Sequence, residues 1–327
     1  MSYNRSEAKA YAREKIRGVW AAIPTPFTPE GDLDEWGLRR NVRHCIEGLE
    51  VDGLFCGGVM GEFWALTGAE RRRVQELVAE EAAGRVPLIA QTGHPSMREA
   101  AALSRHAHEA GFDFVIIMNP YYPPRLTEEM IYAYYAAIAD QVDLGISLFN
   151  TRYSGYQLRP QFIARLAEID NICAIKNPQP IEHTAKVQRL AGDKIVVTEA
   201  AESHWLTLMT EHGLQALMAS ATPFLYQTPE DKPLKTYTEL AFAGQMEEAQ
   251  SIATALEARR RVYHRWMVEP WIERGVVPIA YLKHWTELMG MAAGPVRPPL
   301  LPLTEEEKTA LRTDLERVGL LAGIANI

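Results

Sequence analysis

Short apolar runs alternate with amphipathic stretches along the first three quarters of the chain. The runs have the length of β-strands, and apolar residues in the stretches between them recur every three or four positions, as in helices. Because the runs are continuously apolar, they are typical of strands buried on both faces of a parallel sheet. We expect strands at Val19–Ile23, Gly53–Gly57, Pro87–Thr92, Phe114–Met118, Gly145–Phe149, Ile172–Lys176, Lys194–Thr198 and Leu214–Ala219.

Helices are predicted between these strands, so that strand and helix alternate eight times. The helical pattern is clearest at Glu35–Gly48, Ala69–Ala83, Met97–Ala110, Glu128–Asp140, Pro160–Ile169 and Ser203–His212. Eight such units without a break in composition favour a (β/α)8 TIM barrel of about 250 residues over a doubly wound sheet. No G-x-G-x-x-G or Walker-type loop follows any predicted strand, which argues against a nucleotide-binding Rossmann domain.

The pattern becomes purely helical after Gly244. Helices are expected at Gln245–Trp266, Pro278–Met289 and Thr304–Leu320, with proline-containing breaks between them. We therefore predict an N-terminal segment (1–16), a barrel (17–244) and a C-terminal helical region (245–327).

Composition and charge exclude several classes of function. The chain has 327 residues, of which 47% are hydrophobic and 23% charged, as is ordinary for a soluble globular protein. A net charge of -8 argues against nonspecific nucleic-acid binding and against an anionic membrane surface. The widely spaced Cys45, Cys56 and Cys173 form neither a zinc pattern nor a disulfide framework. With a polar N-terminus and no membrane-length apolar run, we expect a cytoplasmic protein.

Lys176 closes the apolar run Ile172–Lys176. Burial disfavours the charged ammonium, and a lysine whose pKa is lowered in this way becomes a nucleophilic amine that can form a Schiff base. A single lysine at a strand end more often reaches water than reacts. The residues expected around it therefore decide its interpretation.

Other candidate residues follow the predicted strands, at the end of the barrel where active sites lie. A turn with three glycines runs from Gly57 to Gly61, and its backbone N–H groups could bind a carboxylate or could simply make a tight turn. Tyr122 follows the fourth strand, and Tyr153 follows the fifth. No cluster has metal-ligand spacing, and no serine or cysteine nucleophile is supported. A lysine-centred site without metal or cofactor remains.

These residues resemble the dihydrodipicolinate synthase / N-acetylneuraminate lyase superfamily of Schiff-base aldolases. The resemblance rests on Ile23–Phe27, Gly58-x-x-Gly61-Glu62, Pro120–Tyr122, Phe149–Asn150, Ile175–Lys176 and Val296–Leu300, in family order. It implies a TIM barrel with a C-terminal helical extension, usually a homotetramer, and a lysine that forms an imine with pyruvate or a related 2-oxo acid. Lys176 would be that lysine, and the Gly58–Gly61 turn would hold the carboxylate.

The chain departs from the family pattern at several of these positions. Phe149 stands where the family usually has a proton-shuttling tyrosine, and Val59 and Met60 stand where it has hydroxyl residues. Loss of a positioned acid or base costs on the order of 10²–10⁴ in rate, which disfavours a lysine-biosynthetic role. Tyr153, or Tyr122 contributed across a subunit interface as in the family, would replace the missing phenol.

The sequence thus predicts a lyase that acts on a 2-oxo acid through a Lys176 imine and, in the aldolase direction, on an aldehyde. The apolar residues of the site favour an aromatic or aliphatic aldehyde. The alternatives are a 2-oxo acid dehydratase or hydratase-aldolase that uses the same imine, and a binding protein that has lost turnover. The predicted substrate-binding residues are Gly58, Val59, Met60, Phe149, Asn150, Arg152 and Met218.

Overall fold

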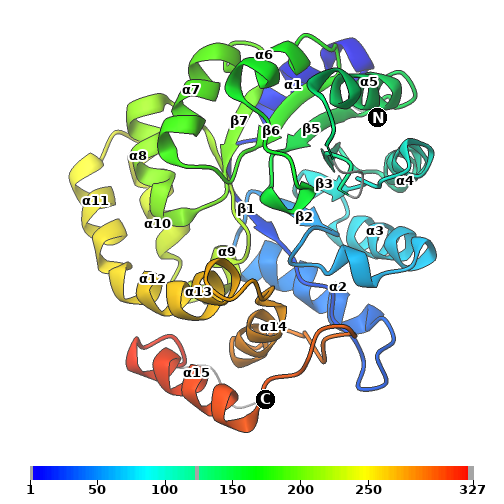
Figure 1. Cartoon of the computed structure of the whole chain (residues 1–327). Coiled ribbons are helices and arrows are strands. Elements are labelled where there is room, and N and C mark those ends of the chain that lie inside the picture. The colour runs from blue at the N-terminus through cyan, green and yellow to red at the C-terminus, as the bar shows by residue number, and fades with distance from the viewer. Residues whose placement is uncertain (1–2, 122–124, 323–327) are drawn as a thin grey trace. The chain divides into compact units, whose positions relative to one another are not determined.

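Eight parallel strands form a closed barrel in sequence order, which confirms the predicted (β/α)8 fold (Figure 1). The computed structural model describes residues 3–121 and 125–322, and of Tyr153 only the main chain. The strands are β1 (Gly18–Ala22), β2 (Gly53–Cys56), β3 (Leu88–Gln91), β4 (Phe114–Met118), β5 (Gly145–Phe149), β6 (Ile172–Lys176), β7 (Val196–Glu199) and β8 (Ala216–Met218).

Every residue of these strands is buried, which is why the runs in the sequence are continuously apolar. The barrel closes where β1 pairs with β8, and Trp20 lies opposite Met218 there. Strand β7 ends one residue later than predicted. The pattern ended at Thr198 because a charged residue follows, yet Glu199 belongs to the strand and is 0% exposed.

The chain divides into two compact units. Unit 1 comprises Met1–Trp20, Asp52–Cys56 and Gly84–Ala219, and therefore holds nearly the whole barrel. Unit 2 comprises Ala21–Val51, Gly57–Ala83 and Ser220–Ile327. The division into an N-terminal segment, a barrel and a C-terminal region stays a prediction.

Unit 1 carries most of the predicted connecting helices. Its helical elements are η1 (Arg5–Glu7), α1 (Ala8–Lys15), α4 (Met97–Ala110), α5 (Glu128–Ala139), η4 (Arg152–Ser154), α6 (Pro160–Leu166), α7 (Ile181–Ala191) and α8 (Glu202–His212). The helix α1 lies in the polar N-terminal segment, where the hydrophobic pattern gave no helix. Small residues form its buried side, namely Ala8 and Ala12, and Lys9 Nζ donates to the Ala167 carbonyl oxygen at 2.6 Å.

Unit 2 contains the first βα connections and the C-terminal helices. Its helical elements are α2 (Glu35–Arg43), η2 (His44–Gly48), η3 (Phe63–Ala65), α3 (Gly68–Ala82), α9 (Thr222–Leu225), α10 (Pro233–Phe242), α11 (Met246–Ala255), α12 (Glu257–Tyr263), η5 (His264–Val268), α13 (Glu269–Ile272), α14 (Ile279–Leu288) and α15 (Glu305–Arg317). The single helix predicted over Gln245–Trp266 is interrupted at Leu256, which lies between α11 and α12.

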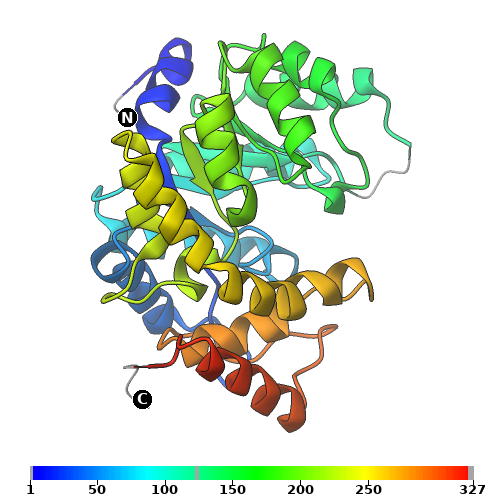
Figure 2. The same ribbon diagram turned by 90° about the vertical axis from the view of Figure 1, so that its left-hand side faces the viewer.

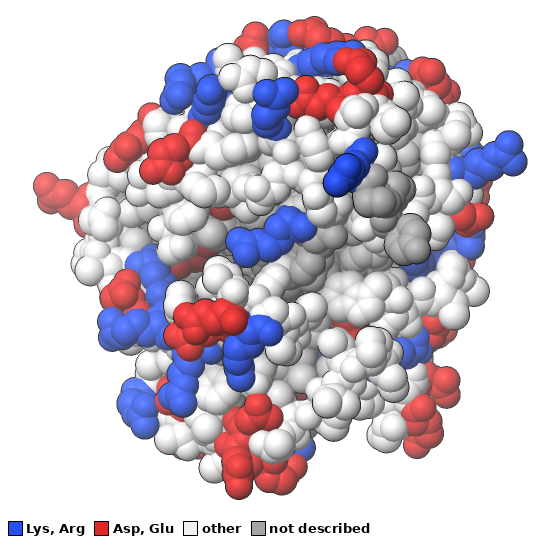
Figure 3. All heavy atoms as spheres, in the orientation of Figure 1, with Lys and Arg blue, Asp and Glu red and all other residues white. Residues whose placement is uncertain are grey.

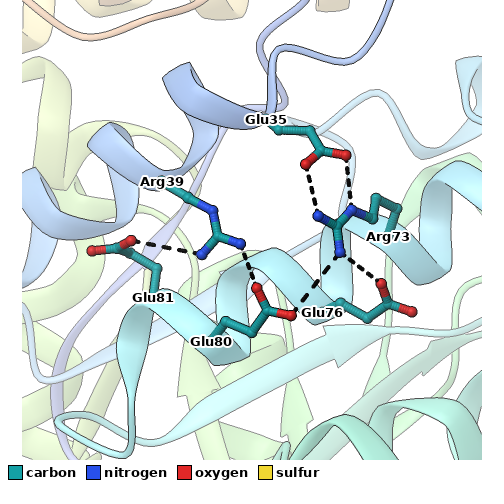
Figure 4. A network of polar contacts seen from close by, with 6 residues as sticks. All are labelled: Glu35, Arg39, Arg73, Glu76, Glu80 and Glu81. Atoms are coloured by element: carbon teal, nitrogen blue, oxygen red, sulfur yellow. Dashed lines mark hydrogen bonds and ion pairs between the residues drawn. The ribbon is translucent and has the colours of Figure 1, made fainter.

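Ion pairs join α2 to α3 on the surface of unit 2 (Figure 4). The Arg73 guanidinium holds both carboxylate oxygens of Glu35, at 2.7 and 2.8 Å, and also contacts Glu76 at 3.0 Å. Arg39 pairs with Glu80 and lies 3.8 Å from Glu81. Because these groups are partly exposed, each pair contributes little to stability, and the network mainly fixes the register of the two helices.

The last two helices, α14 and α15, lie side by side in both ribbon views (Figures 1 and 2). The Tyr281 hydroxyl donates to the Glu307 carboxylate at 2.6 Å, which links them. Thr304 and Glu307 form a capping box at the start of α15. A threonine followed three residues later by a glutamate is a typical sequence pattern for the start of a helix.

Acidic and basic side chains are interspersed on the face drawn in Figure 3, without separation into large areas of one sign. In residues 3–121 and 125–322, we find no helix with the length and apolar character that crossing a membrane requires.

Candidate active site

Lys176 is the last residue of β6, and its side chain is only 2% exposed. Its Nζ donates a hydrogen bond to the carbonyl oxygen of Ala219 at 3.4 Å. Burial lowers the pKa of Lys176 from its usual value of 10.5 to about 7, and the charge of Glu199 acts in the opposite direction. A large fraction of the molecules therefore carries a neutral, nucleophilic amine near neutral pH.

Two aromatic rings lie against this amine. The Lys176 Nζ is 4.7 Å from the ring centroid of Phe55 in β2 and 5.5 Å from that of Phe149 at the end of β5. The two rings pack edge to face, with centroids 6.2 Å apart. They exclude water from the amine, which is the cause of its low pKa, while their faces retain some attraction for the cation.

Asn150 joins the ends of β5 and β6 beside the lysine. Its main-chain N–H donates to the Lys176 carbonyl oxygen at 3.0 Å. Its side-chain Nδ2 donates to Asn177 Oδ1 at 2.8 Å and to the Leu158 carbonyl at 3.2 Å, and its Oδ1 accepts from the Leu158 N–H at 2.7 Å. These bonds hold the loop after β5 in place. Substrate binding by Asn150 stays a prediction.

Glu199 ends β7, the strand next to β6, and its charge acts on the Lys176 amine, which the sequence did not reveal. Lys176 is paired with Thr198 in the β6–β7 register, so Glu199, the next residue along β7, projects from the opposite face of the strand. The Glu199 Oε1 accepts the N–H groups of Ala200 and Ala201 at 2.7 and 2.8 Å. The signal that could have found it was a charged residue directly after an apolar run, as at Lys176.

The glycine turn, Gly57–Gly61, comes directly after β2 in the chain and belongs to unit 2. Its N–H groups at Gly61 and Glu62 donate to carbonyl oxygens within the turn, at 3.1 Å each. The Thr25 hydroxyl donates to the Gly61 carbonyl at 2.9 Å and so holds the turn from outside. No described residue accepts the N–H of Val59 or Met60. The turn therefore offers two adjacent backbone donors that suit an anion.

A buried ion pair follows the same turn in unit 2. Lys283 Nζ lies 2.7 Å from Glu62 Oε1, and the side chains are 2% and 0% exposed. Glu62 has a φ of 51°, in the left-handed region, which ends the turn sharply before η3. Lys283 Nζ also lies 3.9 Å from the ring centroid of Phe27 and donates to the Pro295 carbonyl at 2.8 Å.

The remaining predicted residues fall in different places. Arg152 is an exposed residue of η4, and Met218 is fully buried in β8. The side chain of Tyr153 and the whole of Tyr122 lie outside the described residues. The proton-transfer roles of the two tyrosines and the substrate-binding roles of Arg152 and Met218 therefore stay predictions.

A parallel eight-stranded barrel with a buried lysine of lowered pKa at the end of the sixth strand has the arrangement of a lysine-dependent lyase. The sequence model of the Dihydrodipicolinate synthetase family matches residues 15–318. The chain belongs to this family. It is an enzyme of the class I lyase type, and the predicted family resemblance is confirmed.

Curated relatives align along nearly their full length. The chain is 32% identical over 310 residues to a 4-hydroxy-tetrahydrodipicolinate synthase of Methanothrix thermoacetophila, covering 94% of this chain and 99% of the relative. It is 33% identical over 314 residues to the synthase of Geotalea uraniireducens, covering 94% and 100%. 

Solved structures agree in fold. A prophage protein of the dihydrodipicolinic acid synthase family from Escherichia coli K12, in complex with pyruvate, is 27% identical with a TM-score of 0.82, covering 93% of this chain and 99% of that one. The chloride-inhibited synthase from Acinetobacter baumannii, also complexed with pyruvate, is 26% identical with a TM-score of 0.81 and the same coverage.

Proposed function

We propose that Lys176 forms an imine with pyruvate or a related 2-oxo acid and that the enzyme makes or breaks a carbon–carbon bond through this imine. The observation that carries the proposal is the buried amine, whose pKa of about 7 leaves it partly deprotonated at neutral pH. Pyruvate bound to two structural relatives supports the choice of acid. By the same family likeness, the assembly would be a homotetramer.

The chemistry needs only the lysine and a route for protons. The neutral Nζ attacks the C2 carbonyl, and loss of water gives a protonated imine. That cation draws electrons from the C3–H bond, so that the proton leaves and an enamine forms. The enamine carbon then attacks an aldehyde, and water finally releases the product from the lysine. The reverse sequence cleaves the same bond.

The carboxylate of the 2-oxo acid needs donors of its own. In this proposal the Gly58–Gly61 turn supplies them through the N–H groups of Val59 and Met60, for which no described residue is an acceptor. Main-chain donors act whatever the side chain is, so the loss of the family's hydroxyl residues leaves this function available.

The second reactant would differ from that of the named relatives. Phe149 cannot donate or accept a proton, and Val59 and Met60 are 5% and 4% exposed apolar residues. These replacements disfavour a polar reactant and favour an aromatic or aliphatic aldehyde. The relatives are nevertheless named 4-hydroxy-tetrahydrodipicolinate synthase, so the test includes formation of that product.

Borohydride trapping tests the imine. The protein is incubated with pyruvate and other 2-oxo acids, reduced, and digested for mass spectrometry. We expect a reduced adduct on Lys176 with at least one acid and none in the Lys176→Met variant. Absence of any adduct on Lys176 across the panel contradicts the proposal. Product analysis with aromatic, aliphatic and polar aldehydes then identifies the second reactant.

Dehydration through the same imine is the second candidate function. The observation that supports it is the same buried Lys176 amine, because its imine acidifies the C3–H bond, and loss of that proton can expel a hydroxyl group from C4. Loss of water from a 4-hydroxy-2-oxo acid, such as a 3-deoxy-2-oxo sugar acid, without release of pyruvate would establish it. Adduct formation without turnover of any substrate would instead indicate the binding protein.

A further inference from the structure

The glycine turn ends at a residue whose conformation and burial are both unfavourable. Glu62 has a φ of 51° and a ψ of 40°, in the left-handed region, which residues with a Cβ atom adopt only rarely. Its side chain is a carboxylate that is 0% exposed. Such features persist where the surrounding structure compensates for them, and they cluster at functional sites. The compensation here comes from Lys283 of α14.

Lys283 and Glu62 form an ion pair inside unit 2. The Nζ–Oε1 distance is 2.7 Å, and the Lys283 ammonium also donates to the Pro295 carbonyl oxygen at 2.8 Å. Burial raises the pKa of Glu62 and lowers the pKa of Lys283, and the charge of each partner opposes the effect of burial on the other. Apolar residues at both positions would give a similar stability, so stability alone does not account for the pair.

A second cation holds the chain just after Glu62. The Arg297 guanidinium donates from Nη1 to the Ala65 carbonyl oxygen in η3 and from Nε to the Gly31 carbonyl oxygen, at 2.8 Å each. The Phe27 ring joins the two cations, because its centroid lies 3.9 Å from Lys283 Nζ and 4.1 Å from Arg297 Cζ. Two residues of the C-terminal part of the chain, Lys283 and Arg297, thus fix the end of the turn.

The other contacts of the turn leave two of its N–H groups available to a ligand. Thr25 donates to the Gly61 carbonyl oxygen at 2.9 Å, and an added Cβ at Gly61 would lie 3.1 Å from the Thr25 hydroxyl oxygen, so the two segments are closely packed. Among the described residues, none accepts the N–H groups of Val59 and Met60. Backbone donors bind an anion well only when their directions are already fixed, because otherwise binding must also order them.

We propose that the Glu62–Lys283 ion pair positions the glycine turn, Gly57–Gly61, so that the N–H groups of Val59 and Met60 are aligned for the carboxylate of the 2-oxo acid. This inference rests on the proposed function, in which the turn binds that carboxylate. The pair acts on recognition of the acid and leaves the imine chemistry to Lys176. Lys283 also neutralises Glu62, whose negative charge, two residues after Met60, would otherwise repel the anion.

Comparison of pyruvate with pyruvamide isolates recognition of the carboxylate. Pyruvamide is the uncharged amide of pyruvate and keeps the carbonyl group that forms the imine. For each compound, borohydride trapping over a range of concentrations gives the concentration at which adduct formation on Lys176 is half-maximal. The wild-type protein should prefer pyruvate by about 10-fold or more, because hydrogen bonds to a charged group are stronger than those to a neutral one.

The test variant is Glu62→Leu/Lys283→Met, in which neither position carries a buried charge. We expect its preference for pyruvate over pyruvamide to fall by about 10-fold, because the turn loses the contact that fixes its end. The half-maximal concentration of pyruvamide should change little. Glu62→Gln should keep most of the preference, since its amide oxygen can still accept a hydrogen bond from Lys283.

Tyr281→Phe is the matched control, because Tyr281 lies in α14 two residues before Lys283 and its hydroxyl donates to Glu307 in α15. This variant removes a contact of the same helix and should keep the wild-type preference for pyruvate. Thermal unfolding confirms that each variant is folded at the temperature of the trapping experiment.

An unchanged preference in Glu62→Leu/Lys283→Met, or an equal loss in Tyr281→Phe, overturns the assignment. So does a full loss in Glu62→Gln, which keeps the contact, and so does an equal weakening for pyruvate and pyruvamide, which shows that the pair only supports the fold. A wild-type protein that forms no adduct contradicts the imine instead. One that forms the adduct without preferring pyruvate contradicts binding of the carboxylate by the turn, so failures of the proposed function remain distinct.

Discussion

Phe149 and Lys176 lie opposite each other in the β5–β6 register, with the lysine Nζ 5.5 Å from the centroid of the phenyl ring. The ring excludes water from the amine but has no proton to exchange. The position therefore keeps the lysine nucleophilic and leaves the proton transfers to another residue.

Phe149→Tyr should speed proton transfer at the imine. In this variant we expect deuterium exchange into C3 of pyruvate to rise by about 10-fold or more over the wild type, because a phenol can donate and accept a proton. NMR in D2O measures the rate. No increase would show that a hydroxyl group at this position does not reach the imine carbon.

The rate of adduct formation should depend on pH through the ionisation of Lys176. The neutral amine reacts, so its fraction, and with it the rate, rises as the pH passes through about 7 and then levels off. Mass spectrometry of samples reduced after short incubations gives the profile. A rate that keeps rising towards pH 10.5 would show a lysine with its ordinary pKa.

Removal of the lysine should stabilise the protein in a pH-dependent way. The folded-state pKa of about 7 lies below the usual 10.5, so the unfolded state binds more protons between these values. Burial of the lysine therefore lowers the free energy of unfolding. This destabilisation is largest below about pH 7 and disappears as the pH approaches 10.5. Lys176→Met should therefore raise the Tm by several degrees at neutral pH. The gain should shrink near about pH 9.5, as thermal unfolding would show.

A gain that stays constant with pH would instead assign the effect to the added apolar contacts of methionine. Lys194→Met is a control for the loss of a lysine, because Lys194 lies on the surface in an exposed pair with Glu168. It should change the Tm little at either pH.

The Glu62–Lys283 pair should be important for the stability of unit 2. Breaking it by Lys283→Met leaves an uncompensated buried carboxylate, which costs about 3–5 kcal/mol. The double variant Glu62→Leu/Lys283→Met should lose much less than the sum of the single variants, because no charge then remains buried. Denaturant unfolding gives the free energies. Additive losses would show that the two side chains do not interact.

Most of the fold could be predicted from the hydrophobic pattern. Strands buried on both faces need an uninterrupted apolar run, and β4, β5 and β6 have the predicted bounds. The helix α1 was missed because alanines, which carry little hydrophobic signal, form its buried side. One long helix was predicted after Gly244 because the hydrophobic periodicity continues across the turn at Leu256, which separates α11 from α12.

Site residues could be predicted where the residue and its neighbours in the chain are enough to indicate the chemistry. A lysine that closes an apolar run is a candidate buried amine, and the family motifs in the chain identified both Lys176 and the glycine turn. The sequence also showed that the phenol is missing at Phe149. These conclusions need only the residue and its immediate neighbours in the chain.

Only the tertiary structure decided what surrounds the amine. Phe55 comes from β2, more than a hundred residues from Lys176 along the chain, and its ring lies against the amine. Glu199, whose charge acts on the amine, comes from β7, about twenty residues further along the chain. Barrel formation brings these strands together, and no local pattern records their register. Burial and charge act through space, so the pKa of the lysine is a property of the folded barrel.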